Sequence, residues 1–138
     1  MKNIVVFASG SGSNFIKIYN ETIKNTIDGK IVLLISNNPN CGAVKFARKN
    51  NIDSKIINTY RYNNKIDEEY EITLKSYKTD LILLAGFMKK MPRSIVLIYN
   101  NKIMNIHPAL LPDYGGEGFY GMNVHNAVIS SGDKFSGA

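Results

Sequence analysis

The fold is decided by the stretch Asn3-Ile4-Val5-Val6-Phe7-Ala8-Ser9-Gly10-Ser11-Gly12-Ser13-Asn14, an apolar run that passes into serine and glycine. A continuous apolar run is typical of a strand that is buried on both faces of a parallel sheet. The residues beyond it are apolar at every fourth position, as in a helix: Phe15, Tyr19, Ile23 and Ile27. We expect this helix to stop at Asp28-Gly29. A second apolar run, residues 31–36, follows at once and predicts a strand–helix–strand unit.

The rest of the chain repeats this alternation, with residues 37–40 read as a turn. Further strands are predicted at residues 54–57, 80–86 and 102–106, and helices at residues 43–50, 65–77, 93–99 and 122–131. The pattern predicts an α/β fold, an open and mostly parallel sheet with helices on both faces. Without repeats or an internal boundary, residues 1–138 are predicted to form a single domain. A strand is expected just where the sequence stops, so we expect the domain to be incomplete, with its C-terminal strands missing.

Composition limits the class of protein. Hydrophobic residues make up 44% of the chain and charged residues 20%, as in ordinary globular proteins. No apolar run approaches the roughly 20 residues of a membrane-spanning helix, and a secretory signal is not visible, so we expect a cytoplasmic protein without a membrane partner. Cys41 is the single cysteine, which excludes an internal disulfide. The net charge of +6 comes from scattered lysines rather than a basic run, so it favours anionic small molecules over nucleic acid.

Unusual residues follow several of the predicted strands. They are the serine and glycine loop at residues 9–14, the segment Gly86 to Met91, and Asn105 to His107. Ligands of open parallel sheets bind beyond the carboxyl ends of the strands. Each segment alone would serve as a connector, but together they predict a ligand site.

The serine and glycine loop is suited to a phosphate monoester. Glycines let the backbone approach a ligand closely, and the following helix presents free N–H groups and its positive dipole end to an anion. The loop is not a dinucleotide fingerprint, because Phe15 occupies the third glycine position, and it has no following Lys-Ser/Thr of a nucleotide P-loop. A tight turn in which Ser13 or Asn14 caps the helix is the structural alternative.

The remaining polar residues restrict the chemistry. His107 and His125 stand alone rather than at the paired spacing of metal ligands, so no metal is expected. A nucleophile-elbow serine is also missing. His107 is thus left as a group that transfers a proton or stabilises an oxyanion, helped by the Asn105 amide, since residues two apart on a strand face the same way. On residue type alone, Lys89 and Lys90 are read as solvated charges.

Three quoted segments together resemble the phosphoribosylglycinamide formyltransferase family, folate-dependent enzymes of purine synthesis. They are Ser9-Gly10-Ser11-Gly12-Ser13-Asn14, Ala85-Gly86-Phe87-Met88-Lys89-Lys90 and Asn105-Ile106-His107-Pro108-Ala109-Leu110-Leu111-Pro112. The likeness keeps the family's order and spacing from Met1 to Ala138. It implies a Rossmann-like formyltransferase fold.

The resemblance also implies roles for individual residues. It implies that Gly12, Ser13 and Asn14 bind the substrate phosphate, and that Asn105 binds folate together with Met88, Lys89, Lys90 and Met91. Asn105 and His107 would be catalytic, flanking the formyl carbon as it passes from the co-substrate 10-formyltetrahydrofolate to the amine of 5'-phosphoribosylglycinamide.

Departures from the family pattern keep alternatives open. Where relatives carry His-x-His, this chain reads Asn123-Val124-His125, so His125 is given only a supporting role. The family's catalytic aspartate falls beyond Ser136-Gly137-Ala138, and we expect the chain by itself to be poorly active. The alternatives are a formyltetrahydrofolate hydrolase or another folate formyltransferase, and a catalytically degenerate protein that binds a phosphate ligand. Monomer and homodimer both stay open.

Overall fold

A computed structural model describes residues 1–106 of the chain. The elements run in the order β1 (Lys2–Phe7), α1 (Ser13–Ile23), β2 (Gly29–Ser36), α2 (Gly42–Lys49), β3 (Ser54–Ile56), α3 (Thr59–Tyr62), the 3₁₀ helix η1 (Asn63–Lys65), α4 (Ile66–Ser76), β4 (Leu81–Leu84), α5 (Arg93–Ile98) and β5 (Ile103–Asn105). The chain divides into two units, Met1–Met104 and Asn105–Ala138, and nearly all described residues belong to the first. The helix predicted at residues 122–131 lies outside the described residues.

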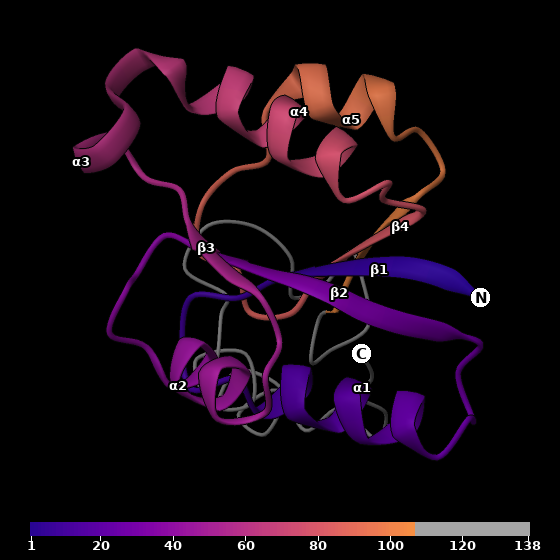
Figure 1. The fold of residues 1–138 in the computed structure, drawn as a ribbon. Coiled ribbons are helices and arrows are strands. Elements are labelled where there is room, and N and C mark those ends of the chain that lie inside the picture. The colour runs from indigo at the N-terminus through magenta and orange to yellow at the C-terminus, as the bar shows by residue number, and fades with distance from the viewer. Residues whose placement is uncertain (107–138) are drawn as a thin grey trace, which may run out of the picture. The chain divides into compact units, whose positions relative to one another are not determined.

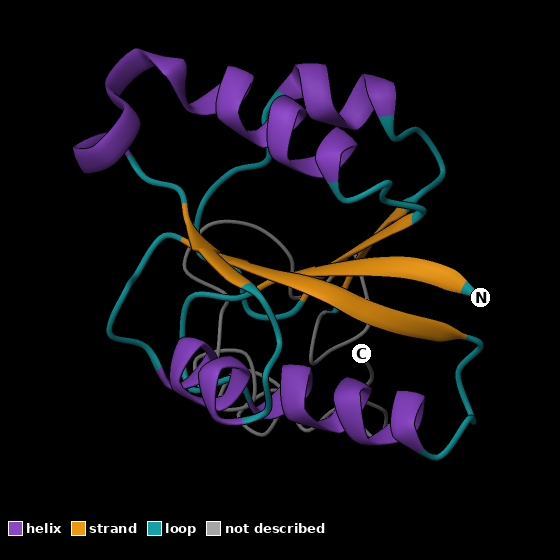
Figure 2. Cartoon of the chain, in the orientation of Figure 1, coloured by secondary structure: helices purple, strands orange, loops and turns teal. Residues whose placement is uncertain are grey.

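The strands form one five-stranded sheet in the order β3-β2-β1-β4-β5 (Figure 1). Strand β1 pairs in parallel with β2 and with β4, and β2 pairs in parallel with β3. Helices α1 and α2 lie on one face of the sheet, whereas α4 and α5 lie on the other (Figure 2). The predicted open parallel sheet with helices on both faces is confirmed.

The core follows from the alternation of side chains along the buried strands. Successive residues of a strand point to opposite faces, and one set packs with α4 and α5 in a cluster of buried residues: Val5, Phe7, Leu33, Ile35, Ile57, Tyr70, Leu74, Ile82, Ile95 and Tyr99. The intervening residues Ile4, Val6 and Leu34 are also buried, as is Phe15 of α1. Because both faces are covered, the strands read as unbroken apolar runs in the sequence.

Helix α1 ends at Ile23, four residues before Ile27, so the prediction that it extends to Asp28-Gly29 was wrong. Asn25 adopts a left-handed backbone with φ of 61°. Its N–H donates to the Thr22 carbonyl (3.2 Å), and the next N–H donates to the Glu21 carbonyl (3.0 Å). This pattern is a Schellman motif, which usually has glycine at the left-handed position. Asparagine tolerates that backbone, so a glycine was not needed to end the helix.

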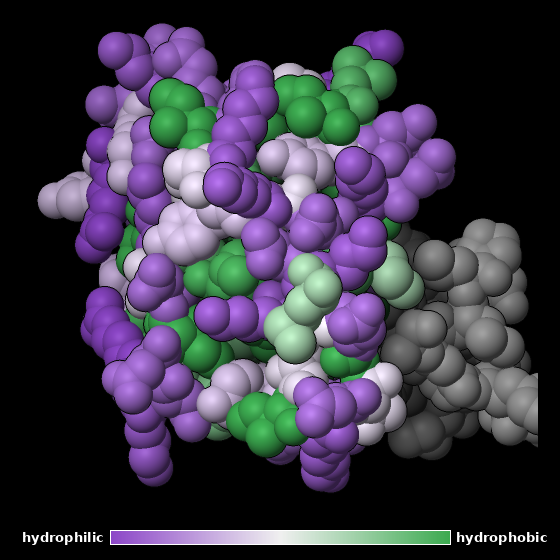
Figure 3. All heavy atoms as spheres, turned by 45° about the vertical axis from the view of Figure 1, so that its right-hand side comes forward, coloured by the Kyte–Doolittle hydropathy of each residue, from purple (hydrophilic) through white to green (hydrophobic). Residues whose placement is uncertain are grey.

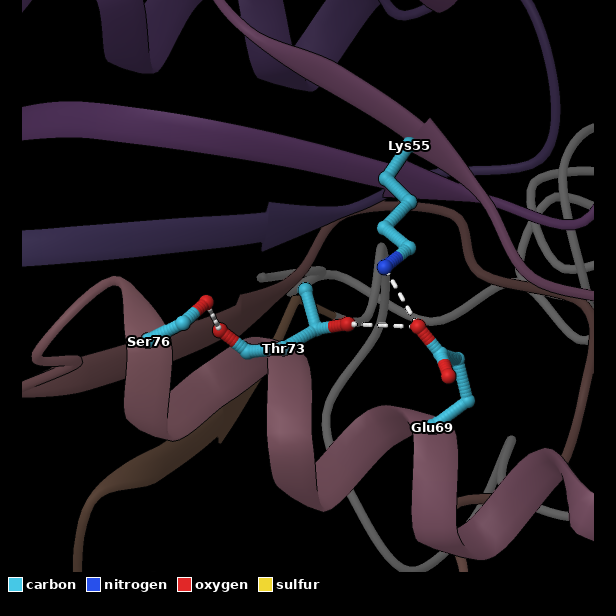
Figure 4. A network of polar contacts seen from close by, with 4 residues as sticks. All are labelled: Lys55, Glu69, Thr73 and Ser76. Carbon is cyan, nitrogen blue, oxygen red and sulfur yellow. Dashed lines mark hydrogen bonds and ion pairs between the residues drawn. The ribbon is translucent and has the colours of Figure 1, made fainter.

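The segment before α4 is also helical, which the sequence reading did not predict. The side-chain oxygen of Asn58 accepts a hydrogen bond from the Arg61 N–H (2.9 Å) and caps α3. A separate polar network joins β3 to α4. Lys55 of β3 forms an ion pair with Glu69 of α4, and the Thr73 hydroxyl lies 3.4 Å from the same carboxylate oxygen (Figure 4). This network ties α4 to the edge strand β3.

The described surface is mixed in character. Hydrophilic side chains cover most of the face in Figure 3, with separate apolar patches between them. The exposed apolar residues of α5 are Val96, Leu97 and Ile98. Among residues 1–106, no helix has the length and apolar character to cross a membrane.

Candidate functional site

The order of the strands places two predicted binding loops at a topological switch point. From β1 the sheet grows outward through β2 and β3, and the chain then returns to add β4 on the other side of β1. The loops after β1 and β4 leave neighbouring strands at this reversal, which is where ligands of open α/β sheets bind. Residues 9–14 belong to the first loop and residues 86–91 to the second. The structure therefore brings together the predicted phosphate-binding and folate-binding segments.

The loop after β1 is fixed by close contact with the start of α2. Gly12 adopts φ of 83°, and a Cβ atom there would lie 2.8 Å from the Ala43 Cα. The Ala43 N–H donates to the Gly10 carbonyl (3.1 Å), and a Cβ on Gly42 would meet the Ser11 carbonyl oxygen at 2.6 Å. Both the backbone conformation and the lack of space require glycine at position 12, independently of any ligand.

The first turn of α1 is open to an anion. Gly12 is the N-cap residue, and no described side chain caps the helix. Ser13 is exposed and Asn14 is half-buried, so neither acts as the predicted alternative cap. The first N–H groups of a helix have no partners within the helix, and the positive end of its dipole favours negative charge. An acidic residue does not occur in this turn, so the loop has the chemistry of a phosphate site.

Of the predicted folate residues in the loop after β4, Lys89 and Lys90 line a pocket of about 560 Å³. Met88 is 51% exposed, and Lys89 and Lys90 are exposed, whereas Met91 packs partly buried against the core. Neither lysine forms an ion pair within the described part of the chain. The pocket is lined by Asn37, Ile57, Asn58, Thr59, Tyr60, Asn63, Asn64, Ile66, Asp67, Tyr70, Lys89, Lys90 and Pro92. Both exposed lysines border the same cavity.

A buried serine connects these loops, and the sequence reading gave it no role of its own. The Ser9 N–H donates to the Gly86 carbonyl (3.1 Å), and the Met88 N–H donates to the Ser9 hydroxyl oxygen (2.8 Å). The Ser9 hydroxyl in turn donates to the Asn37 side-chain oxygen (2.5 Å). For Asn37 the sequence predicts only a place in a turn. Its carbonyl accepts a hydrogen bond from the Asn58 side chain (2.9 Å), which continues the chain of contacts to α3.

Tyr70 contributes a neutral phenol to the pocket. Burial, and secondly the Asp67 carboxylate, raise the pKa of Tyr70 to about 12. Its ring lies 5.6 Å from that of Phe7, centroid to centroid, which anchors the phenol to β1. At neutral pH this side chain stays protonated and adds no charge to the pocket.

The predicted catalytic pair is only partly described. Asn105 is the exposed last residue of β5 and belongs to the second unit, whereas His107 and His125 lie outside the described residues. Within residues 1–106, no group of His, Cys, Asp and Glu side chains is arranged to hold a metal ion.

These features define a class of protein, an α/β domain with a glycine-rich loop and a basic loop side by side at the switch point of a parallel sheet. The model of the formyl transferase family matches residues 2–138. The chain belongs to the formyl transferase family.

Similar proteins include two from plants and one bacterial protein of known structure. The chloroplastic phosphoribosylglycinamide formyltransferase of Arabidopsis thaliana is 40% identical over 139 residues, covering 99% of this chain and 48% of that protein. The one from Vigna unguiculata is 39% identical, covering 99% and 44%. Glycinamide ribonucleotide transformylase 1 from Geobacillus kaustophilus has a TM-score of 0.84 at 30% identity, covering 94% of this chain and 68% of that one. The chain spans about half the length of the plant relatives, and its expected formyltransferase fold is confirmed.

Proposed function

We propose that the protein transfers the formyl group of 10-formyltetrahydrofolate to the amine of 5'-phosphoribosylglycinamide, a step of purine synthesis. The proposal is supported by the family and by the names of the similar proteins, which are phosphoribosylglycinamide formyltransferases. The structural observation that carries it is the uncapped start of α1, held against α2 beside the basic loop after β4. A phosphate site next to a larger pocket suits a phosphorylated acceptor and a second, bulkier substrate.

The substrate phosphate is proposed to bind at Gly12, Ser13 and Asn14. Backbone N–H groups of the first turn would donate to its oxygens, with the Ser13 hydroxyl and the Asn14 amide beside them. Folate is proposed to bind along Met88, Lys89, Lys90 and Met91, where the pocket offers apolar and cationic groups together. Asn105 is proposed to share in binding folate.

Asn105 and His107 are proposed to act on the transferred group. The glycinamide nitrogen attacks the formyl carbon and forms a C–N bond, which gives a tetrahedral oxyanion. This intermediate collapses as the bond from the carbon to the folate nitrogen breaks, and the proton lost by the amine reaches that nitrogen. The Asn105 amide would donate to the oxyanion, and the His107 imidazole would stabilise it and move the proton. A covalent enzyme intermediate is not required.

The domain organisation, the location and the partners of the protein are also proposed. We propose that residues 1–138 form one formyltransferase domain, which the match over residues 2–138 supports. A cytoplasmic location is proposed, although two similar plant proteins are named chloroplastic. The partners are proposed to be small molecules rather than nucleic acid, because the charge of +6 is scattered. Monomer and homodimer are equally compatible with this function.

The function is tested by assaying the protein, as its gene encodes it, for formation of formylated phosphoribosylglycinamide. The variant Asn14→Ala should raise KM for phosphoribosylglycinamide by about tenfold, as expected for one lost hydrogen bond to a charged group. The acceptor without its phosphate provides the control, because on it the variant and the wild type should perform alike. A substitution of Gly12 does not serve here, since it would clash with α2 whether or not phosphate binds.

Other outcomes would identify the alternatives. Release of formate from 10-formyltetrahydrofolate at the same rate with and without the acceptor would indicate a hydrolase. Binding of phosphoribosylglycinamide by calorimetry without formyl transfer would indicate a degenerate binding protein. Either result would overturn the proposed function.

A further inference from the structure

The loop after β4 depends on one side chain from another strand. Ser9 follows β1 and is only 8% exposed. Its backbone N–H donates to the Gly86 carbonyl (3.1 Å), while its hydroxyl oxygen accepts from the Met88 N–H (2.8 Å). Ser9 therefore forms hydrogen bonds with the beginning of this loop at two residues, Gly86 and Met88. Gly86, the first of these points, has a left-handed backbone with φ of 74°.

The Ser9 hydroxyl can accept from the Met88 N–H with a defined geometry because its own hydrogen is donated to the Asn37 side chain. A hydroxyl has one donor hydrogen and two acceptor lone pairs. The Ser9 hydroxyl donates to the Asn37 side-chain oxygen at 2.5 Å, which leaves a lone pair free to point at the Met88 N–H. Asn37 follows β2, and its own carbonyl accepts from the Asn58 side chain (2.9 Å). The position of the Met88 backbone is thus set by residues that follow β1 and β2.

We propose that Ser9 and Asn37 are positioning residues, which set the geometry of the Met88–Met91 segment through the Met88 backbone. The inference rests on the proposed function in one respect, that this segment binds the folate co-substrate. Ser9 is buried and does not line the pocket, so it would act on folate through the loop, whereas Asn37 also lines the pocket. Serine and asparagine are suited to this task since both are short and polar, and a part-buried hydrogen-bonded network around a buried serine favours a single arrangement.

The test measures both the loop and the reaction in the protein as its gene encodes it. Ser9→Ala leaves the Met88 N–H without its partner, so amide hydrogen exchange at Met88 should accelerate about tenfold. KM for 10-formyltetrahydrofolate should rise by about the same factor, while kcat and KM for phosphoribosylglycinamide change less than about twofold. Asn37→Ala should act in the same direction. The double variant should be no worse than Ser9→Ala, because both changes break one connected link.

Two further variants separate positioning from general destabilisation. Asn37→Asp keeps an acceptor for the Ser9 hydroxyl, so amide exchange at Met88 should stay near the wild-type rate. Ser76→Ala is the matched control. It also removes a serine hydrogen bond, from the Ser76 hydroxyl to the Thr73 carbonyl (2.8 Å), but this bond lies within α4 and involves neither loop (Figure 4). It should change neither readout.

The possible failures are distinguishable. Exchange at Met88 that accelerates no more in Ser9→Ala than in Ser76→Ala would overturn the positioning role, whatever the enzyme does. An unchanged folate KM in an active Ser9→Ala variant would overturn it as well. A wild-type protein that transfers no formyl group would instead overturn the proposed function, and Met88 exchange would still decide whether Ser9 holds the loop.

Discussion

Gly12 and Gly86 both lie in loops that follow neighbouring strands and both have a left-handed backbone, with φ of 83° and 74°, yet their surroundings differ. A Cβ atom on Gly12 would lie 2.8 Å from the Ala43 Cα, whereas no described atom lies within 4 Å of such an atom on Gly86. The loop after β1 is therefore held by backbone packed against backbone. The loop after β4 is held by hydrogen bonds to Ser9. The first arrangement tolerates no added atom, while the second tolerates added atoms but depends on one hydroxyl.

The largest effect is expected from Gly12→Ala. The left-handed backbone costs an L-residue roughly 1–2 kcal/mol, and forcing a methyl group against α2 adds about 1–3 kcal/mol. The free energy of unfolding, measured with urea, should fall by about 2–5 kcal/mol in total. Gly10→Ala in the same loop is the control, because its added methyl group would meet no described atom within 4 Å. Equal losses in the two variants would show that the contact with Ala43 is unimportant.

Most of the fold could be predicted because its signals are local and periodic. The buried strands of a parallel sheet are continuous apolar runs, and β1, β2 and β4 were found from them. Helix ends were less predictable. Asn25, Asn51 and Lys78 take left-handed conformations after α1, α2 and α4, so non-glycine residues end these helices. Helix α3 was missed although Asn58 is a good N-cap residue, because only four residues follow it in the helix.

The site could be predicted only as segments. That two loops meet at a switch point follows from the alternation of elements and from the rule for parallel sheets. The contact of Gly12 with Ala43 and the bonds of Ser9 join residues distant in sequence. Neither periodicity nor residue type carries that information. In the sequence Ser9 is therefore one more serine of the serine and glycine loop, although it is the buried connection between the loops.

A second, smaller effect on stability is expected from Tyr70, which lines the pocket that borders the β4 loop. Burial, and then Asp67, raise the pKa of Tyr70 from 10.0 to about 12, so between these values the folded protein retains a proton that the unfolded chain releases. Stability should be unaffected by this group below pH 10 and should fall as the pH rises toward 12. Between about pH 9 and pH 12, the wild type should lose about 2 kcal/mol more than Tyr70→Phe. Urea unfolding at each pH measures the free energy of unfolding of both proteins. If both lost the same amount between about pH 9 and pH 12, the Tyr70 phenol would not be desolvated.

The smallest effect, and the sharpest contrast with Gly12, is expected from Gly86→Ala. Only the cost of the left-handed backbone applies, because the space around Gly86 is open among the described residues, and unfolding by urea should become easier by about 1 kcal/mol. Gly86→Asn should cost less than half of this, since asparagine visits that conformation readily. Gly12→Asn should still cost about 1–3 kcal/mol, because asparagine reduces the backbone cost but not the contact with α2. If Gly12→Asn cost no more stability than Gly86→Asn, backbone conformation alone would govern the two loops, and the division between a packed loop and a tethered loop would be wrong.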